Sequence, residues 1–177
     1  MILLLSACAK PPVGPATSPL ACPVGTSPAG QPPPAGLEVW CQRPIPGGSV
    51  REGPAIEYHP TGEVHGQGLY TDGVRTGPWE WRYPGGQPER RGSFVLGRED
   101  GEWVRWYADG VEQSRGVYVG GREQGTWTIF DEEAATRLVG SYQLGNRVGI
   151  WVLTDSTGRP AREDRYEDGR LVSVREL

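Results

Sequence analysis

The side chains best suited to catalysis or metal binding are few in this 177-residue sequence. It has two histidines, His59 and His65, which flank the turn at residues 60–63. A hairpin centred on this turn places the two imidazoles on opposite faces of the strand pair. The sequence therefore predicts solvated histidines and no metal site.

Four carboxylates could pair for acid and base catalysis on a glycan: Glu80, Asp109, Glu112 and Asp131. Their places at turns and in exposed strand positions instead predict a solvated role. The sequence contains no nucleophile elbow, phosphate-binding loop or dinucleotide-binding fingerprint. We therefore expect a protein that is not an enzyme and that needs no cofactor.

Composition narrows the fold class and the kinds of partner. Glycine accounts for 27 residues and proline for 17, whereas methionine occurs once, and this balance favours an all-β, turn-rich protein over a helical or doubly wound enzyme. A charged content of 23% is too high for a bundle of membrane helices. The net charge of -4 leaves no basic surface for nucleic acid, so no nucleic-acid partner is expected.

The first cysteine follows a short apolar stretch at residues 1–7. The four residues Leu5-Ser6-Ala7-Cys8 resemble the lipobox of bacterial lipoproteins, in which the cysteine is lipidated and becomes the mature N-terminus. The resemblance implies a membrane anchor at Cys8. Ala9 stands where an inner-membrane retention signal carries Asp, so the resemblance also implies the outer membrane.

The remaining cysteines, Cys22 and Cys41, form an even pair, which in an exported protein predicts a disulfide. Their spacing is not Cys-x-x-Cys, and no further ligands suggest zinc. Closing the Pro- and Gly-rich loop between them stabilises the fold by about 3 kcal/mol on the chain-entropy model. Residues 9–21 have the Pro, Ser and Gly content of an extended spacer. The expected organisation is a lipoprotein signal at residues 1–8, a linker at 9–21, a disulfide-closed segment at 22–48 and a repeat domain at 49–177.

An internal repeat with a period of 24 residues organises the chain from Gly53 to about residue 172. Each of the five units begins on a glycine, has a first aromatic column two residues later, and continues through a second glycine to a second aromatic column. The first column holds Trp79, Trp103, Trp127 and Trp151, and the second holds Tyr70, Phe94, Tyr118, Tyr142 and Tyr166. Ala55 and Asp164 break the columns in the first and last units, as expected of terminal repeats.

Each unit is predicted to be a β-hairpin. Asp109-Gly110 predicts a two-residue type I′ turn, because both central residues of that turn need positive φ. Centring the turn there sets Trp103 opposite Gly116, so that the indole lies over a residue without a Cβ. The same centring between units sets Tyr118 opposite Trp127. All the aromatic columns then fall on one face, as a continuous ladder in one elongated antiparallel sheet of about ten strands.

These columns resemble MORN repeats, and more closely the bacterial variant that is often labelled antitoxin-like. The matching stretch reads Tyr118-Val-Gly-Gly121-Arg-Glu-Gln-Gly125-Thr-Trp127, and the pattern recurs in the other units. The resemblance covers about two thirds of the chain. It implies an elongated single sheet of hairpins that serves as a scaffold or binding platform.

The face opposite the ladder is predicted to be apolar near the middle of the sheet. The side chains concerned are Val95, Val104, Trp106, Val117, Val119 and Phe130. Such a patch is either covered, here by residues 22–46 or by twist of the sheet, or used by a partner. On the ladder face, Trp81 is expected to stack with Arg90 across the strand pair.

Together these features favour a non-catalytic lipoprotein of the bacterial cell envelope, anchored in the outer membrane and facing the periplasm or the cell surface. Its expected role is to bind an unidentified envelope protein through the β-repeat sheet. Two alternatives remain open: an antitoxin or immunity-type protein that neutralises a toxin, and a cell-wall glycan binder or hydrolase. An upstream toxin gene would favour the first alternative, and sugar turnover would favour the second.

If Cys8 carries the anchor, the substitution Cys8→Ser should release the protein from membranes, because the acyl chains that insert into the bilayer are no longer attached. The measurement is the distribution of the full chain between membrane and soluble fractions of a bacterial host. Thr17→Ser in the linker is the matched control and should stay with the membranes. Unchanged partitioning of Cys8→Ser would rule out the anchor.

Overall fold

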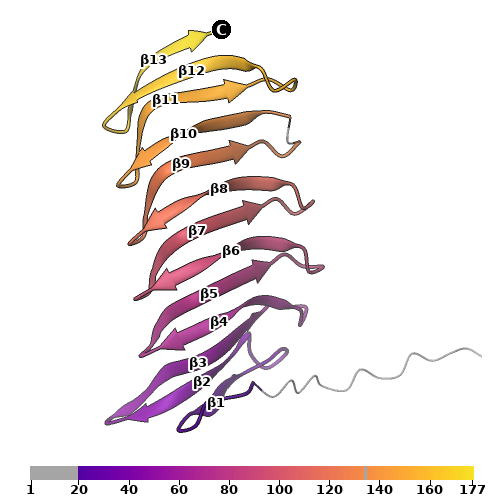
Figure 1. Cartoon of the computed structure of the whole chain (residues 1–177). Coiled ribbons are helices and arrows are strands. Elements are labelled where there is room, and N and C mark those ends of the chain that lie inside the picture. The colour runs from indigo at the N-terminus through magenta and orange to yellow at the C-terminus, as the bar shows by residue number, and fades with distance from the viewer. Residues whose placement is uncertain (1–19, 134) are drawn as a thin grey trace, which may run out of the picture.

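The computed structural model describes residues 20–133 and 135–177, and the predicted lipidation site at Cys8 lies outside them. The described chain forms one open antiparallel sheet of 13 strands that follow one another in sequence order (Figure 1). The strands are β1 (Ser27–Gln31), β2 (Glu38–Ile45), β3 (Gly48–Tyr58), β4 (Val64–Thr71), β5 (Val74–Arg82), β6 (Pro88–Val95), β7 (Arg98–Trp106), β8 (Glu112–Val119), β9 (Arg122–Phe130), β10 (Arg137–Gln143), β11 (Asn146–Thr154), β12 (Pro160–Glu167) and β13 (Arg170–Glu176). Within these residues, no helix has the length and apolarity needed to cross a bilayer.

The predicted all-β fold of five hairpin units is confirmed, with β3 to β12 as the ten expected strands. Three more strands extend the same sheet. The segment at 22–48 supplies β1 and β2, and β13 follows the last unit. Because β1 and β2 lengthen the sheet at one end, they leave the middle strands uncovered, and the expectation that this segment covers them is wrong (Figure 1).

The two edges of the sheet turn differently. At the tight edge, which joins successive units, the turn has two residues with positive φ, as at Leu96 (50°) and Gly97 (77°), which matches a type I′ turn. At the looped edge, inside each unit, the loop is longer. The Gly110 N–H donates to the Tyr107 carbonyl oxygen at 3.0 Å, and of residues 108–110 only Gly110 has positive φ, at 92°.

The turn predicted at Asp109-Gly110 is therefore wrong in type: it is a three-residue loop that ends in a glycine bulge. The carboxylate of Asp109 accepts the backbone N–H of Val111 at 2.9 Å, which stabilises this longer loop. The predicted register survives, since Trp103 still pairs with Gly116. The extra loop residue is absorbed next to Trp106, where the register shifts.

Between units, the predicted register is wrong. Tyr118 pairs with Glu123 rather than with Trp127. The strand β9 carries two more residues than β8 between successive paired positions, which makes a bulge at the start of the unit. Gly125 lies in this bulge with a φ of 71°, a conformation that L side chains rarely adopt.

The bulge decides which indole lies over which glycine. A Cβ atom on Gly116 would lie 2.1 Å from the side chain of Trp127, and one on Gly92 would lie 2.2 Å from that of Trp103. Each tryptophan therefore packs on the second glycine of the preceding unit. The prediction that Trp103 covers Gly116 is wrong, although the two residues are paired along the backbone.

The same offset explains the broken columns at both ends of the repeat. Eleven residues separate each slot glycine from the tryptophan above it, so the counterpart of Asp164 is Arg175 and no indole needs the space. Asp164 is instead buried and accepts a hydrogen bond from Arg162 at 2.9 Å. In the first unit, Ala55 stands in the tryptophan column, and the residue eleven positions earlier is Pro44.

The aromatic columns form the predicted ladder on one face, here called the first face. The ring centroids of Tyr118 lie 6.0 Å from Trp103 and 5.2 Å from Trp127, both edge to face. This alternation continues along the sheet, and the column tryptophans are 6% exposed or less. Edge-to-face pairs of this kind stabilise the fold beyond simple burial of area.

Two tryptophans outside the 24-residue columns join the ladder. Trp81 stacks on Trp79 at 5.3 Å and on Trp103 at 6.1 Å, and the Arg90 guanidinium lies 3.9 Å from its ring centroid, as predicted. Trp40 on β2 packs against the ladder at its N-terminal end. Periodicity could not reveal these contacts, because neither residue recurs at the same place in other units.

Side chains of the looped edge connect each unit to the next. The hydroxyl groups of Tyr83 and Tyr107 donate to the carbonyl oxygens of Trp106 and Phe130 at 2.9 and 3.0 Å. His59 occupies the same column, and its Nε2 lies 2.8 Å from the carbonyl oxygen 23 residues further along the chain. The units are therefore joined at this edge by side chains as well as by the backbone ladder.

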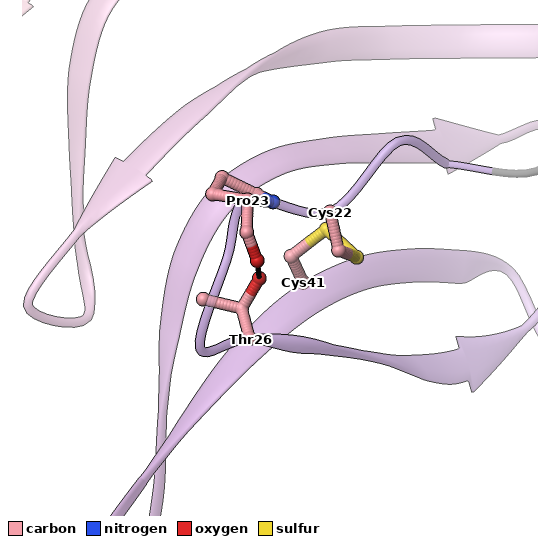
Figure 2. The surroundings of a disulfide bond; sticks show 4 residues. All are labelled: Cys22, Pro23, Thr26 and Cys41. Carbon is pink, nitrogen blue, oxygen red and sulfur yellow. Dashed lines mark hydrogen bonds between the residues drawn. A yellow bond between two sulfur atoms is a disulfide. The ribbon is translucent and has the colours of Figure 1, made fainter.

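The predicted disulfide between Cys22 and Cys41 is confirmed, with Cα atoms 5.4 Å apart (Figure 2). Cys41 is fully buried on β2. After Cys22 the chain turns tightly, and the Thr26 hydroxyl donates to the Pro23 carbonyl oxygen at 2.7 Å (Figure 2). The Pro23 ring lies against Gly53, where a Cβ would come within 2.9 Å of it, so the disulfide fastens this turn to the first unit.

The glycine slot can be tested at Gly116. Gly116→Val should lower the free energy of unfolding by about 1–3 kcal/mol or more, because the new side chain overlaps an indole. In a double-mutant cycle followed by chemical denaturation, the effect should couple to Trp127→Leu and not to Trp103→Leu. Gly48→Ala, at an open position, is the control and should change stability little. Coupling to Trp103 alone would contradict the offset.

The disulfide makes a second prediction about stability. Replacing Cys22 and Cys41 together by serine should lower stability by about 3 kcal/mol, because the unfolded chain regains the freedom of the open loop. Hydrogen exchange should speed up mainly in β1 to β3, where the linked segments lie. Thiol labelling of the exported wild-type protein should need prior reduction, and free thiols in that protein would refute the pairing.

Candidate binding surfaces

The second face of the sheet, opposite the ladder, carries all six residues predicted as a partner surface. Val95, Val117 and Val119 are 54%, 40% and 58% exposed. Trp106 and Phe130 are half-buried, and Val104 is buried at 8% exposure. The structure therefore leaves three of these valines fully open to a partner.

These apolar side chains alternate with polar ones and do not form a continuous patch. Val104 pairs with Arg91 on one side and with Arg115 on the other, whose long side chains flank it. Val117 pairs with Glu102 and with a glutamine. The surface thus offers separate apolar contacts within a charged frame, a composition typical of protein interfaces that form and dissociate.

A groove on the second face is a feature that sequence analysis missed. It has a volume of about 690 Å³ and crosses β3 to β7. Its apolar lining includes Pro54, Ile56, Leu69 and Pro78, and Leu20, the first described residue, also lines it. Residues from five strands meet here only because of the bulges between units, and the expected even spacing gave no sign of them.

A second hollow of about 440 Å³ lies on the same face at β9 to β12. Its apolar lining includes Val139, Ile150 and Val152. Ile150 is 52% exposed. The second face therefore has hollows toward both ends of the sheet, and the exposed valines lie between them.

The two histidines differ from the sequence expectation. Their ring centroids are 4.5 Å apart, so the prediction of opposite faces is wrong. The reason is again the loop type, since Tyr58 pairs with Val64 and His59 belongs to the loop. His65 Nε2 lies 3.3 Å from a Glu89 carboxylate oxygen. In the described part of the chain, no three His, Cys, Asp or Glu residues are placed to hold a metal ion.

The four carboxylates considered for catalysis all have structural partners. Glu80 accepts a hydrogen bond from the Gln67 amide at 2.6 Å, and Glu112 pairs with Arg115 at 2.6 Å. Asp109 stabilises its own loop, as described above. Asp131 accepts hydrogen bonds from Thr136 and a neighbouring backbone N–H, and these bonds lower the pKa of its carboxyl group.

The rim of the first face is made of arginines that lie over the ladder. Arg51 lies over Trp40 and donates to Glu38 at 2.6 Å and to the Tyr70 hydroxyl at 3.1 Å. Burial alone would lower the pKa of Arg51, but these hydrogen bonds raise it overall. Tyr118 has no such donor nearby within 3 Å, and burial raises its pKa to about 12. It is therefore protonated at neutral pH.

The first unit has a known counterpart. Residues 51–72 are a MORN repeat variant. This match spans most of β3 and all of β4, including the bulge glycine Gly53 and the column aromatic Tyr70. The resemblance to MORN repeats is thus confirmed for this stretch, and the other units repeat its strands and columns. No curated protein matches the chain at a significant level.

Proposed function

We propose that this protein is a non-catalytic scaffold of the bacterial cell envelope that binds a partner protein through the second face of its sheet. The observation that carries this proposal is the uncovered middle of that face. Val95, Val117 and Val119 remain 40–58% exposed there, and β1 and β2 extend the sheet beyond them. Exposed apolar side chains in a charged frame favour a protein partner over an extended polyanion.

The repeat supports the role of a platform. Each unit adds two strands to one sheet, so the second face grows along the strand stack while the ladder stabilises it from the other side (Figure 1). A MORN repeat variant at residues 51–72 is compatible with this role, because such repeats often mediate binding to proteins or membranes. Trp106, half-buried beside Arg91, has the residue type most common among interface anchors.

The proposed address is the outer membrane, with a lipid at Cys8 and a spacer at residues 9–21. A disulfide between Cys22 and Cys41 fits an oxidising compartment outside the cytoplasm. The spacer of 13 residues could reach about 40 Å when extended as polyproline II helix. That reach would hold the sheet clear of the lipid headgroups and leave its second face accessible.

Comparing two tryptophans tests this proposal. Trp103→Ala should lower stability by about 3–5 kcal/mol, since it removes a buried ladder residue. Trp106→Ala should change the melting temperature little and weaken partner capture about tenfold or more, as loss of an interface anchor does. The measurements are thermal melting and quantitative pull-down of the full chain from detergent-solubilised envelopes.

Leu144→Ala, an exposed change at the tight edge, is the matched control for the pull-down. It should keep both the melting temperature and the captured protein. If Trp106→Ala destabilised the sheet as strongly as Trp103→Ala, the second face would be core and the proposed surface would be excluded. Equal capture by Trp106→Ala and the wild type would also exclude it.

A further inference from the structure

Two adjoining hollows open at the looped edge, where the second and third units meet. Their volumes are about 270 and 190 Å³, and Arg90 and Trp106 line both of them. Arg82 and Arg91 also line the larger hollow, and Arg105 lines the smaller one. Trp106 belongs to the predicted partner surface, so the hollows adjoin the second face.

The charge at these hollows is positive, although the whole chain has a net charge of -4. Four arginines line the hollows against two carboxylates, Glu80 and Glu89. Both carboxylates are already engaged. Glu80 is bonded to Arg82 at 3.1 Å and to Gln67 at 2.6 Å, and Glu89 lies 3.3 Å from His65.

Arg90 and Arg105 face each other directly across β6 and β7. Like charges at directly opposed positions destabilise a sheet. The Nε–H groups of both residues are buried and have no hydrogen-bond partner among the described residues. Burial lowers the pKa of Arg90, and the charges of Arg105 and Arg75 lower it further.

The repeat itself does not require this pair of arginines. Gly66, Ser114 and Leu138 occupy the column of Arg90 in other units, and Ile129 occupies that of Arg105 in the next unit. A local arrangement that opposes stability without serving the fold is typical of a functional site. The sheet therefore keeps two facing cations at a place where its own architecture would accept neutral residues.

The arginines are oriented but not neutralised. Stacking on Trp81 at 3.9 Å holds the guanidinium of Arg90, and that of Arg91 lies 5.3 Å from the Trp106 ring. Among residues 20–133 and 135–177, no carboxylate lies within salt-bridge distance of Arg91 or Arg105. For Arg90, the nearest is the neighbouring Glu89, 3.9 Å from its Nε.

We propose that these two hollows bind the carboxylate side chains of an acidic segment of the partner protein. The inference rests on the proposed scaffold function and adds the chemistry that the partner presents. Arg90 contributes to both hollows, Arg91 to the larger and Arg105 to the smaller. Two carboxylates of one segment can therefore be held side by side, with Trp106 between them.

The site favours carboxylates over phosphates and polyanions for three reasons. The planar guanidinium groups match a planar carboxylate in a two-point contact. Each hollow has one carboxylate in its own wall, which repels a dianion more strongly than a single negative charge. The net charge of -4 also opposes the approach of a membrane surface or nucleic acid, whose charge extends beyond the hollows.

The test uses a fluorescein-labelled peptide of alternating glutamate and glycine, with the glutamine analogue as the control probe. Binding to the full chain is measured by fluorescence anisotropy at low salt, together with NMR of the arginine Nε–H signals. The glutamate peptide should bind at least tenfold more tightly than the glutamine peptide. It should shift the signals of Arg90 and Arg105, and it should lose affinity with added salt.

Two variants assign the binding to the hollows. Arg105→Gln should weaken peptide binding at least tenfold, and it should not lower the melting temperature, because it removes a like-charge pair. Arg91→Gln is a second variant at an exposed position and should weaken binding in the same direction. Arg122→Gln at the exposed tight edge makes the same change in net charge and should bind as the wild type does.

Three outcomes would overturn the proposal. Equal weakening by Arg122→Gln would mean that net charge alone attracts the peptide. Wild-type binding by both Arg105→Gln and Arg91→Gln would place the peptide elsewhere. Inorganic phosphate or anionic vesicles that shift the arginine signals as strongly as the peptide would assign the hollows to phosphate groups. Because the peptide assay needs no natural partner, its result is separate from partner capture by Trp106→Ala.

Discussion

The fold depends on the contact between an indole ring and a backbone position that has no Cβ. The slot glycines Gly68, Gly92, Gly116 and Gly140 lie 2.1 to 2.2 Å from the tryptophan rings when a Cβ is built on them, so any other residue would displace the ring. Because the ring comes from the following unit, this contact joins neighbouring units. The same atoms thus bury the aromatic core and set the spacing between hairpins.

A single-layer sheet has no second layer to bury its apolar face, and this protein solves the problem along the direction of the strand stack. Tyrosine or phenylalanine rings fill the space between successive tryptophans, edge to face, and arginines cover the rim of the ladder. A hairpin alone would leave its tryptophan exposed, since the glycine that accommodates the ring belongs to the preceding unit. Stability is therefore a property of adjacent pairs of units.

The sequence predicted the features that repeat and missed those that shift by one or two residues. The 24-residue period and the two-residue alternation were enough to place the aromatic columns on one face and Trp103 opposite Gly116. The bulge at Gly125 could not be inferred from alternation, because it adds an even number of residues and keeps every side chain on its expected face. It moves the indole by a whole unit all the same.

The candidate surfaces followed the same division. Parity alone placed Trp106 and its neighbouring valines on the second face, but it could not show that Arg91 and Arg115 separate them. The groove and the arginine-lined hollows needed the true between-unit register and the loop geometry, neither of which has a separate residue signature. The disulfide could be predicted because only one pairing of Cys22 and Cys41 exists once Cys8 is set aside.

Strand order and sequence order coincide throughout the sheet. Distance along the molecule is therefore proportional to position in the chain, and one unit of two strands corresponds to roughly 10 Å. Gaining or losing a whole 24-residue unit would change the length of the sheet in steps of this size without altering any contact inside the remaining units. The architecture thus behaves as a ruler, in which the number of repeats sets how far apart two points of attachment can lie.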